Sequence, residues 1–448
     1  MRITPVILAA GEGTRMKSAI PKVLHPILGR PMIWYVLQSV RQITDSQPII
    51  VVGPGAEAIR DIVGESAAFV TQAERLGTGH AVMQAESLLR GHTDLVLVLY
   101  ADMPLLTADT LQLLVDSQRD HQGPITMLTN LSEDPRGFGR ILRSEDGKIQ
   151  AIVEEAQATS QQLKIRELNT GVYCFNSDWL WGALARIPLS PKGEYYLTDL
   201  AEIAVSDQLT VQSVTLEASE ETIGINTRVH LAEASVCMQR RINHDLMLSG
   251  VTMIDPASVF IEPGIKIGQD TVIWPNTYLH GRTQIGERCN LGPNTIIRDS
   301  QIGNRCKVLA SVLEGAILEN EVEMGPFARL RKGAHLADGV HMGNFGEVKN
   351  SYLGPGTKMG HFSYMGDATL GSNVNIGAGT ITCNYDGKQK YKTSIGADAF
   401  IGSDTMLVAP VNLGEGAQTG AGSVVTKDIP AHTLAVGMPA RAIRKLEK

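Results

Sequence analysis

The chain has 448 residues, of which 43% are hydrophobic and 19% charged, values typical of a soluble globular protein with two or three domains. Its net charge of −7 is spread along the chain, which argues against a nucleic-acid-binding surface. The longest apolar runs, such as Leu95–Tyr100, are too short to cross a membrane, and the first residues lead into a strand pattern rather than a signal peptide.

Residues 1 to 227 alternate between strand and helix patterns. Apolar runs predict strands at Pro5–Ala10, Ile49–Val52 and Leu95–Tyr100. Apolar residues at helical spacing predict helices over Ile33–Val40 and Ala81–Leu89. Strands separated by helices predict a Rossmann-like α/β domain, with a parallel sheet covered on both faces and a ligand beyond the carboxyl ends of its strands.

The first strand leads into a glycine-rich loop that ends in Gly11-Glu12-Gly13-Thr14-Arg15 and is followed by Pro21-Lys22. The loop matches neither a Walker A motif nor a GxGxxG fingerprint. Its glycines let backbone N–H groups approach phosphate oxygens, and Arg15 and Lys22 can neutralise such an anion. A GxG loop alone is as typical of a tight turn, but these two cations favour an anion site.

Asp102 follows the Leu95–Tyr100 strand, where a carboxylate would face a nucleotide and its metal ion. A lone aspartate in this place is more often a turn or capping residue. Several motifs together change that interpretation: Leu8-x-Ala-Ala-Gly-x-Gly-Thr-Arg-Met, Pro21-Lys22, Gln72-x4-Gly77-Thr78 and Tyr100-x-Asp102. As a set they resemble the sugar-1-phosphate nucleotidyltransferases.

A second apolar stripe at helical spacing follows this domain, formed by Leu231, Ala234, Met238, Ile242 and Leu246. We expect it to be a helix that connects two domains. The chain would then divide into a nucleotidyltransferase domain at 1–227, a helical linker at 228–250, and a repeat domain with a C-terminal tail at 251–448.

From residue 251 onward, aliphatic–glycine pairs such as Ile285-Gly286 and Leu291-Gly292 recur in steps of six residues. This period is typical of a parallel β-helix, in which three hexads make one turn of a triangular prism. Glycine and asparagine suit its tight corners because they tolerate positive φ. The repeat resembles the left-handed β-helix of the hexapeptide acyltransferases. Its handedness comes from that resemblance, since the general rule for crossovers favours a right-handed turn.

The hexad rhythm is interrupted by a polar, basic segment at 383–392, which we expect to leave the prism as a loop. His361 directly follows a hexad glycine; a lone histidine in a repeat is usually a surface residue. However, Lys349 lies 12 residues before His361, and Arg331 lies 18 residues before Lys349. Because both separations are multiples of six, we expect the three residues near related edges of successive coils, which favours a site.

Further motifs occur in order: Gly137-Phe138-Gly139-Arg140, Ile152-Val153-Glu154-Glu155, Asn169-Thr170-Gly171, Gly193-Glu194-Tyr195-Tyr196-Leu197-Thr198-Asp199 and Gly224-Ile225-Asn226. With the repeat, they make nearly the whole chain similar to the bifunctional glucosamine-1-phosphate acetyltransferases and N-acetylglucosamine-1-phosphate uridylyltransferases. The resemblance implies a cytoplasmic homotrimer that uses glucosamine-1-phosphate, acetyl-CoA, UTP and Mg²⁺. Its product, UDP-N-acetylglucosamine, is a precursor of bacterial cell-wall polymers. The five scattered cysteines fit reduced cytoplasmic thiols.

For the first domain, the resemblance implies a nucleotide site formed by Leu8, Ala9, Ala10, Gly11, Gly13, Gln72, Gly77, Thr78 and Tyr100. Arg15 and Lys22 would steady the phosphates, and Asp102 and Asn226 would bind Mg²⁺. The acetylated sugar would contact Gly139, Glu154, Asn169 and Asn226. Uridylyl transfer would then follow by direct attack of the sugar phosphate on UTP.

For the repeat domain, the resemblance makes His361 the base that deprotonates the amine. Arg331, Lys349 and Lys390 would bind the sugar phosphate, and the sugar would be oriented by Tyr364, Asn375, Asn384 and Tyr385. Acetyl-CoA would contact Ala378, Ser403 and Ala421. The family's C-terminal coenzyme-binding arginine is replaced here by Met438, with Arg441, Arg444 and Lys445 as possible substitutes.

Two other functions remain open from the sequence, because a fold does not prove an activity. The chain would be a single-activity nucleotidyltransferase if its β-helix only assembles or regulates it. It would be a non-enzymatic scaffold or nucleotide-sugar sensor if neither site turns over. The polar residues around His361 speak against the first alternative.

Overall fold

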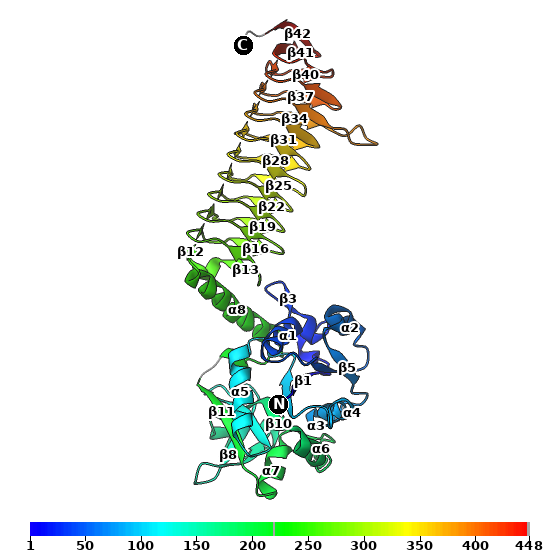
Figure 1. The fold of residues 1–448 in the computed structure, drawn as a ribbon, viewed down its shortest axis with the longest axis vertical. Coiled ribbons are helices and arrows are strands. Elements are labelled where there is room, and N and C mark those ends of the chain that lie inside the picture. Colours follow the sequence, from blue (N-terminus) through cyan, green and yellow to red (C-terminus); the bar gives the residue numbers. More distant parts are fainter. Residues whose placement is uncertain (218–219, 446–448) are drawn as a thin grey trace. The chain divides into compact units, whose positions relative to one another are not determined.

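The computed structural model describes residues 1–217 and 220–445 and divides the chain into two compact units, Met1–Met238 and Gln239–Lys448 (Figure 1). Helix α8 (Arg228–Leu248) begins in the first unit and ends in the second. The boundary between the units therefore falls inside this helix. No helix among the described residues is long and apolar enough to span a membrane.

The first unit contains a nine-stranded mixed sheet. Its main path is β11 (Val211–Glu217), β7 (Ile125–Leu131), β10 (Glu167–Asn176), β6 (Leu95–Tyr100), β1 (Ile3–Ala9), β4 (Ile49–Val52) and β5 (Ala68–Thr71). The hairpin of β8 (Gly139–Arg143) and β9 (Ile149–Val153) joins it through β10. The prediction of a purely parallel sheet is wrong, because β10 is antiparallel to both β6 and β7. A hairpin rather than a crossover helix precedes β10, and only a crossover returns a chain in parallel.

Helices cover both faces of this sheet, as the sequence predicts. One buried cluster joins the sheet to α1 (Met32–Ile43), α2 (Glu57–Val63) and α5 (Ala108–Asp120). The other joins it to α3 (Thr78–Met83), α6 (Ser177–Leu184) and α7 (Asp199–Ser206). In β1, Ile7 belongs to the first cluster and Val6 and Leu8 to the second, because successive residues of a strand face opposite sides.

The single helix predicted over residues 81–89 is instead two short helices, α3 and α4 (Glu86–Leu89). The amides of Gln84 and Ala85 donate to the carbonyls of Ala81 and Val82, three residues earlier, which tightens the chain and ends α3. Leu88, assigned to the apolar stripe, is exposed as a result.

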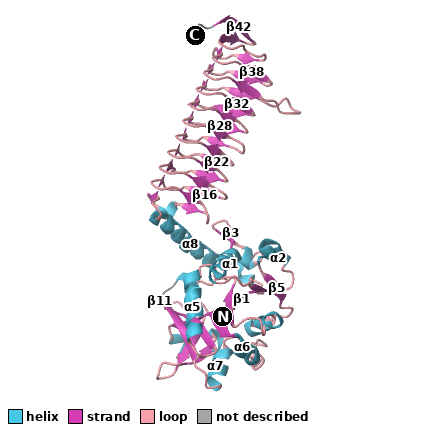
Figure 2. Cartoon of the chain, viewed as in Figure 1, coloured by secondary structure: helices cyan, strands magenta, loops and turns pink. Residues whose placement is uncertain are grey.

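After α8, the described part of the second unit consists of strands, turns and the 3₁₀ turn Pro256–Ser258 (Figure 2). The strands form three parallel sheets, which we call sheets I, II and III and which begin at β12 (Thr252–Met253), β13 (Phe260–Ile261) and β14 (Lys266–Ile267). Consecutive strands of one sheet are successive coils of the prism. This is the architecture of the predicted left-handed β-helix.

The C-terminal coils carry the residues of interest. Sheet I continues there through β27 (His341–Met342), β30 (Lys358–Met359), β33 (Asn375–Ile376), β36 (Phe400–Ile401), β39 (Gln418–Thr419), β41 (Thr433–Gly437) and β42 (Ala440–Lys445). Sheet II continues through β25 (Arg329–Leu330), β28 (Gly346–Lys349), β31 (Ser363–Gly366), β34 (Ile381–Cys383), β37 (Met406–Val408) and β40 (Val424–Val425). Strands β29 (Tyr352–Leu353), β32 (Ala368–Leu370), β35 (Thr393–Ile395) and β38 (Val411–Leu413) belong to sheet III.

The prism interior consists of aliphatic columns that the six-residue period predicts. In sheet II, for example, Leu313, Leu330, Val348 and Met365 lie in register on successive coils and are buried. Each of these side chains stacks on its counterparts and loses its contact with water, which stabilises the coil. The insertion after Cys383 does leave the wall as a loop, between β34 and β35 (Figure 1).

Candidate active sites

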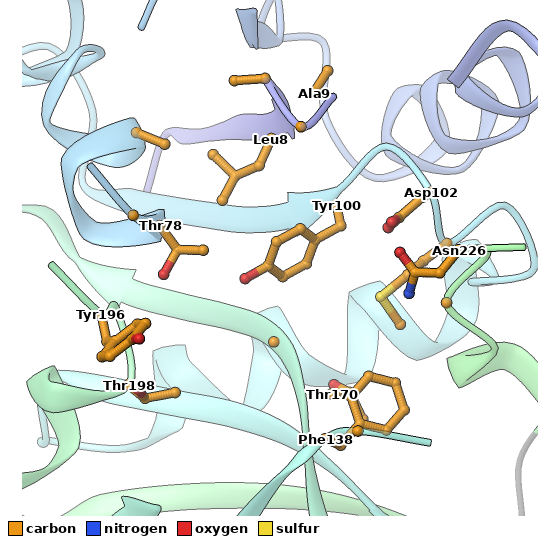
Figure 3. Close-up of a pocket in the computed structure, with 18 of the residues that line it drawn as sticks. Leu8, Ala9, Thr78, Tyr100, Asp102, Phe138, Thr170, Tyr196, Thr198 and Asn226 are labelled. Carbon is orange, nitrogen blue, oxygen red and sulfur yellow. The ribbon is translucent and has the colours of Figure 1, made fainter. Parts of the chain in front are cut away.

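A cavity of about 470 Å³ opens in the first unit at the carboxyl ends of β1 and β6 (Figure 3). Fourteen of the sequence-predicted residues line it: Leu8, Ala9, Ala10, Gly11, Lys22, Gln72, Gly77, Thr78, Tyr100, Asp102, Gly139, Glu154, Asn169 and Asn226. Gly13 and Arg15 do not. Gly13 begins a 3₁₀ turn with φ of 65°, and Arg15 is exposed on that turn.

Two oxygen donors converge at one end of this cavity. The ammonium of Lys22 forms an ion pair with Asp102 and donates to Oδ1 of Asn226 at 3.1 Å. The carboxylate and the amide oxygen thus both face one cation, and Figure 3 shows them side by side. Hard oxygen donors of this kind fit Mg²⁺, which uses few protein ligands and completes its shell with phosphates and water. Among the described residues, no cluster of three or more His, Cys, Asp or Glu side chains offers a metal site.

The opposite wall is acidic and partly dry. Thr198 Oγ1 donates to Glu154 Oε1 at 3.0 Å, yet burial raises the pKa of the Glu154 carboxyl above its usual range. Burial, helped by Glu202 and Glu154, likewise raises the pKa of Asp199 to about 6. A desolvated carboxylate gains most from a ligand that donates hydrogen bonds to it, as sugar hydroxyl and amide groups do.

A bulge in β10 shapes the floor of the cavity. The register against β7 shifts between Asn169 and Tyr173, and Asn169 donates to the Tyr173 hydroxyl at 2.7 Å. Gly171 lies in the bulge with φ of 82°, where an added Cβ would collide with the ring of Tyr100. Glycine is therefore required here twice, for the backbone angle and for the close approach of Tyr100.

Arg140 holds the sugar-side wall together from behind. Although charged, it is only 1% exposed; its guanidinium donates to the Phe138 carbonyl and pairs with Glu155 at 3.1 Å. It thereby fastens the turn before Gly139 to the residue after Glu154. The sequence quoted this arginine in a motif without predicting its burial, because arginine is seldom fully buried.

Five further polar or charged side chains line the cavity that the sequence did not single out: Arg75, Thr170, Glu194, Tyr196 and Thr198. Three of them lie in the Gly193–Asp199 motif, which was the available signal. Arg75 pairs with Glu12 and donates to the carbonyl of Ala10 at 3.0 Å, so it braces the glycine loop from outside.

In the second unit, the predicted base and coenzyme contacts share one edge of the prism, which we call the I–II edge because it joins sheets I and II. Strand registers on both sides align His361, Ala378, Ser403 and Ala421 on successive coils. His361, Ser403 and Ala421 are exposed, and Ala378 is half-buried. These positions thus form a continuous column on the surface.

The predicted phosphate-binding cations gather at the other end of sheet II, where it meets sheet III. The Arg331 amide donates to the Val348 carbonyl, which places Arg331 beside Lys349 on the next coil. Lys390, on the loop, contacts Lys349 and with Arg331 lowers the pKa of the Lys349 ammonium. Three cations held together in this way favour an anion that neutralises them.

The remaining predicted residues lie between or beside these two groups. Tyr364 is on the sheet II face, Asn375 is on sheet I, and Asn384 is buried at the base of the loop with its amide on Asp367 at 2.5 Å. Tyr385 is exposed. The expectation that His361 shares related edges with Arg331 and Lys349 is only half met. Three hexads make a coil, so a separation of 18 keeps the edge, whereas 12 moves to another.

Comparison with known protein families gives three matches. Residues 5–174 match the MobA-like NTP transferase domain, residues 264–299 the bacterial transferase hexapeptide (six repeats), and residues 392–427 the hexapeptide repeat of succinyl-transferase. The chain is 49% identical over 434 residues to the bifunctional protein GlmU of Heliobacterium modesticaldum, covering 97% of this chain and 95% of that protein. It is 46% identical to bifunctional protein GlmU of Syntrophomonas wolfei, over 97% of each chain, and 44% identical to that of Bacillus velezensis, over 98% and 96%.

Proposed function

Since the chain belongs to the GlmU family of bifunctional proteins, we propose that it makes UDP-N-acetylglucosamine in two steps at two separate sites. Acetyl-CoA first acetylates the amine of glucosamine-1-phosphate. UTP then transfers its uridylyl group to N-acetylglucosamine-1-phosphate, and pyrophosphate is released. The observation that carries this proposal is that the residues for the two reactions fall into two sites, the cavity of the first unit and the edges of the prism. We propose that the activities divide at the predicted linker, 228–250.

The first-unit site suits direct attack without a covalent enzyme intermediate. The sugar phosphate oxygen attacks the α-phosphorus of UTP in line with the leaving pyrophosphate. The protein has to align these groups and offset their negative charge. Lys22 lies ready for that charge, and the buried Glu154 carboxyl accepts hydrogen bonds from the sugar. Mg²⁺, when bound by Asp102 and Asn226, supplies further charge neutralisation on the phosphates.

The prism site suits acyl transfer to an amine. A protonated amine is not nucleophilic, so a base that titrates near neutrality has to remove its proton, and histidine is suited to this. His361 takes that proton, the amine attacks the thioester carbonyl, and coenzyme A leaves as its thiol after protonation. Arg331, Lys349 and Lys390 bind the sugar phosphate.

We propose a homotrimer, because one chain does not bring the base and these cations to one small substrate. Five residues of strand separate His361 from Gly366, the partner of Lys349, roughly 16 Å at about 3.3 Å per residue. The amine and phosphate of glucosamine-1-phosphate are on adjacent carbons, so both must be bound within a few ångströms. Setting one edge of a prism against another edge of a neighbouring copy meets this need, with the projecting loop reaching across.

Mixing two inactive variants tests this shared site. Neither His361→Ala nor Lys349→Ala alone should acetylate well, but randomly mixed trimers should regain about a quarter of the wild-type sites, because some neighbours then offer both intact edges. Co-expression with two affinity tags and a coenzyme A release assay measures this. Failure of the mixed trimers to exceed either parent would contradict a site built from two copies.

The proposed activity itself is tested by coenzyme A release when acetyl-CoA and glucosamine-1-phosphate are mixed with the enzyme. Thiol release that depends on both substrates is expected. No release, alongside normal pyrophosphate release from UTP and N-acetylglucosamine-1-phosphate, would leave a single-activity nucleotidyltransferase. We place the enzyme in the cytoplasm; in support, the described residues contain no disulfide.

A further inference from the structure

The I–II edge changes character at His361. On the preceding coils it carries Phe327 and Phe345, in register with Phe362. These rings are 62%, 60% and 55% exposed, and the first two stack at 5.6 Å. Both adopt φ near 60°, which a bulky side chain rarely does. The edge before His361 is therefore blocked by large aromatic side chains.

On the following coils the same edge is lined by small residues. The column that contains His361 continues through Ala378, Ser403 and Ala421 to Gly437, which pairs in register with Ala421. An extended ligand arm whose reactive end lies at His361 therefore finds room in one direction only, toward the C-terminal end of the prism. The proposed acetyl-CoA contacts lie on this side.

The small-residue edge ends at a basic hairpin. Strand β42 adds to β41 and so becomes the last strand of sheet I. From the coil of His361 to β42 there are five strand spacings of about 4.8 Å, roughly 24 Å. This is longer than an extended pantetheine arm. It is close to the distance from the sulfur to the ribose 3′-phosphate of extended coenzyme A.

Strand register determines which cation of the hairpin lies nearest the edge. Arg441 pairs with Val436, one residue before Gly437, whereas Arg444 pairs with Leu434 and Lys445 with Thr433, farther along β41. Ala435 points into the prism and is buried, so its neighbours Val436 and Leu434 face outward with their partners. Arg441 is exposed and projects beside the end of the column. Met438, in the hairpin turn, carries no charge.

We propose that Arg441 binds the 3′-phosphate of coenzyme A and replaces the arginine that Met438 displaces. The proposal rests on the proposed acetyl transfer, because that reaction supplies the ligand. The guanidinium offers two parallel N–H donors to a phosphate, a geometry that gives strong, charge-assisted hydrogen bonds. The role passes to Arg441 because the hairpin brings it to the edge from the adjacent strand.

Equilibrium binding of coenzyme A and of 3′-dephospho-coenzyme A to the full-length protein, measured by titration calorimetry, tests this without relying on turnover. The wild-type protein should bind coenzyme A about tenfold more tightly than the dephospho form. In Arg441→Ala this ratio should fall close to one, with affinity for the dephospho form unchanged. Arg441→Lys should retain part of the ratio, and Arg444→Ala, on the same strand, all of it.

The outcomes separate this inference from the function on which it rests. Unchanged affinity for the dephospho form also shows that the hairpin of Arg441→Ala is folded. A wild-type ratio in Arg441→Ala, or an equal loss of affinity for both coenzymes, would overturn the role of Arg441. A wild-type protein that binds both equally would also overturn it while leaving acetyl transfer intact. Binding of neither coenzyme would overturn both.

Discussion

Asp102→Ala is expected to lower the kcat of uridylyl transfer by about 10³-fold or more, about 4 kcal/mol of transition-state stabilisation, while acetyl transfer stays within twofold of wild type. The substitution removes the one carboxylate that faces the phosphate end of the cavity and leaves Lys22 with Asn226 alone. Pyrophosphate release and coenzyme A release, assayed on the same preparation, measure the two activities.

The matched control for this substitution is Asp109→Ala, which removes an exposed carboxylate from the first turn of α5, outside the cavity. It should leave both activities intact. Near-normal uridylyl transfer in Asp102→Ala would contradict the metal-binding role of this residue. Loss of acetyl transfer as well would show that the substitution damages the whole protein rather than one site.

His361→Ala is expected to show the reverse pattern. Loss of the general base should lower the kcat of acetyl transfer by about 10² to 10⁴-fold, with uridylyl transfer unchanged. Because a base acts only when unprotonated, the wild-type rate should also fall as the pH drops below the titration of this histidine, and the residual rate of the variant should not follow that dependence. Rates of thiol release measured across pH give both results.

His341→Ala serves as the control for His361→Ala. His341 is also an exposed prism histidine, but it lies on a sheet I strand and pairs with Glu323 at 3.5 Å, away from the I–II edge. Its removal should leave acetylation unchanged. Retained acetylation in His361→Ala would refute the assignment of the base.

The sequence predicts the prism better than the sheet, for a physical reason. A six-residue period is repeated over many coils, so the inward positions and the corners follow from counting alone. The open sheet of the first unit has no such repeat. The direction of β10 depends on whether a helix or a hairpin precedes it, and the segment before it carries no strong pattern for either.

The candidate sites show a similar division. Motifs near strand ends located the cavity, because parallel strands bring their carboxyl ends to one edge. The ion pair of Lys22 with Asp102 spans 80 positions and could not be read from spacing. In the prism, multiples of six identify corners but not which corner, so the separation of His361 from Lys349 by most of a sheet face emerged only from strand register.

The central claim, that one polypeptide carries two sequential sites, is tested most directly by mass spectrometry of the complete reaction. With glucosamine-1-phosphate, acetyl-CoA, UTP and Mg²⁺, UDP-N-acetylglucosamine should form. Omission of acetyl-CoA alone should abolish it, and supplying N-acetylglucosamine-1-phosphate should then restore it. Omission of UTP should leave N-acetylglucosamine-1-phosphate to accumulate. If no acetylated sugar phosphate forms under any of these conditions while uridylyl transfer proceeds, the prism has no catalytic site and the account fails.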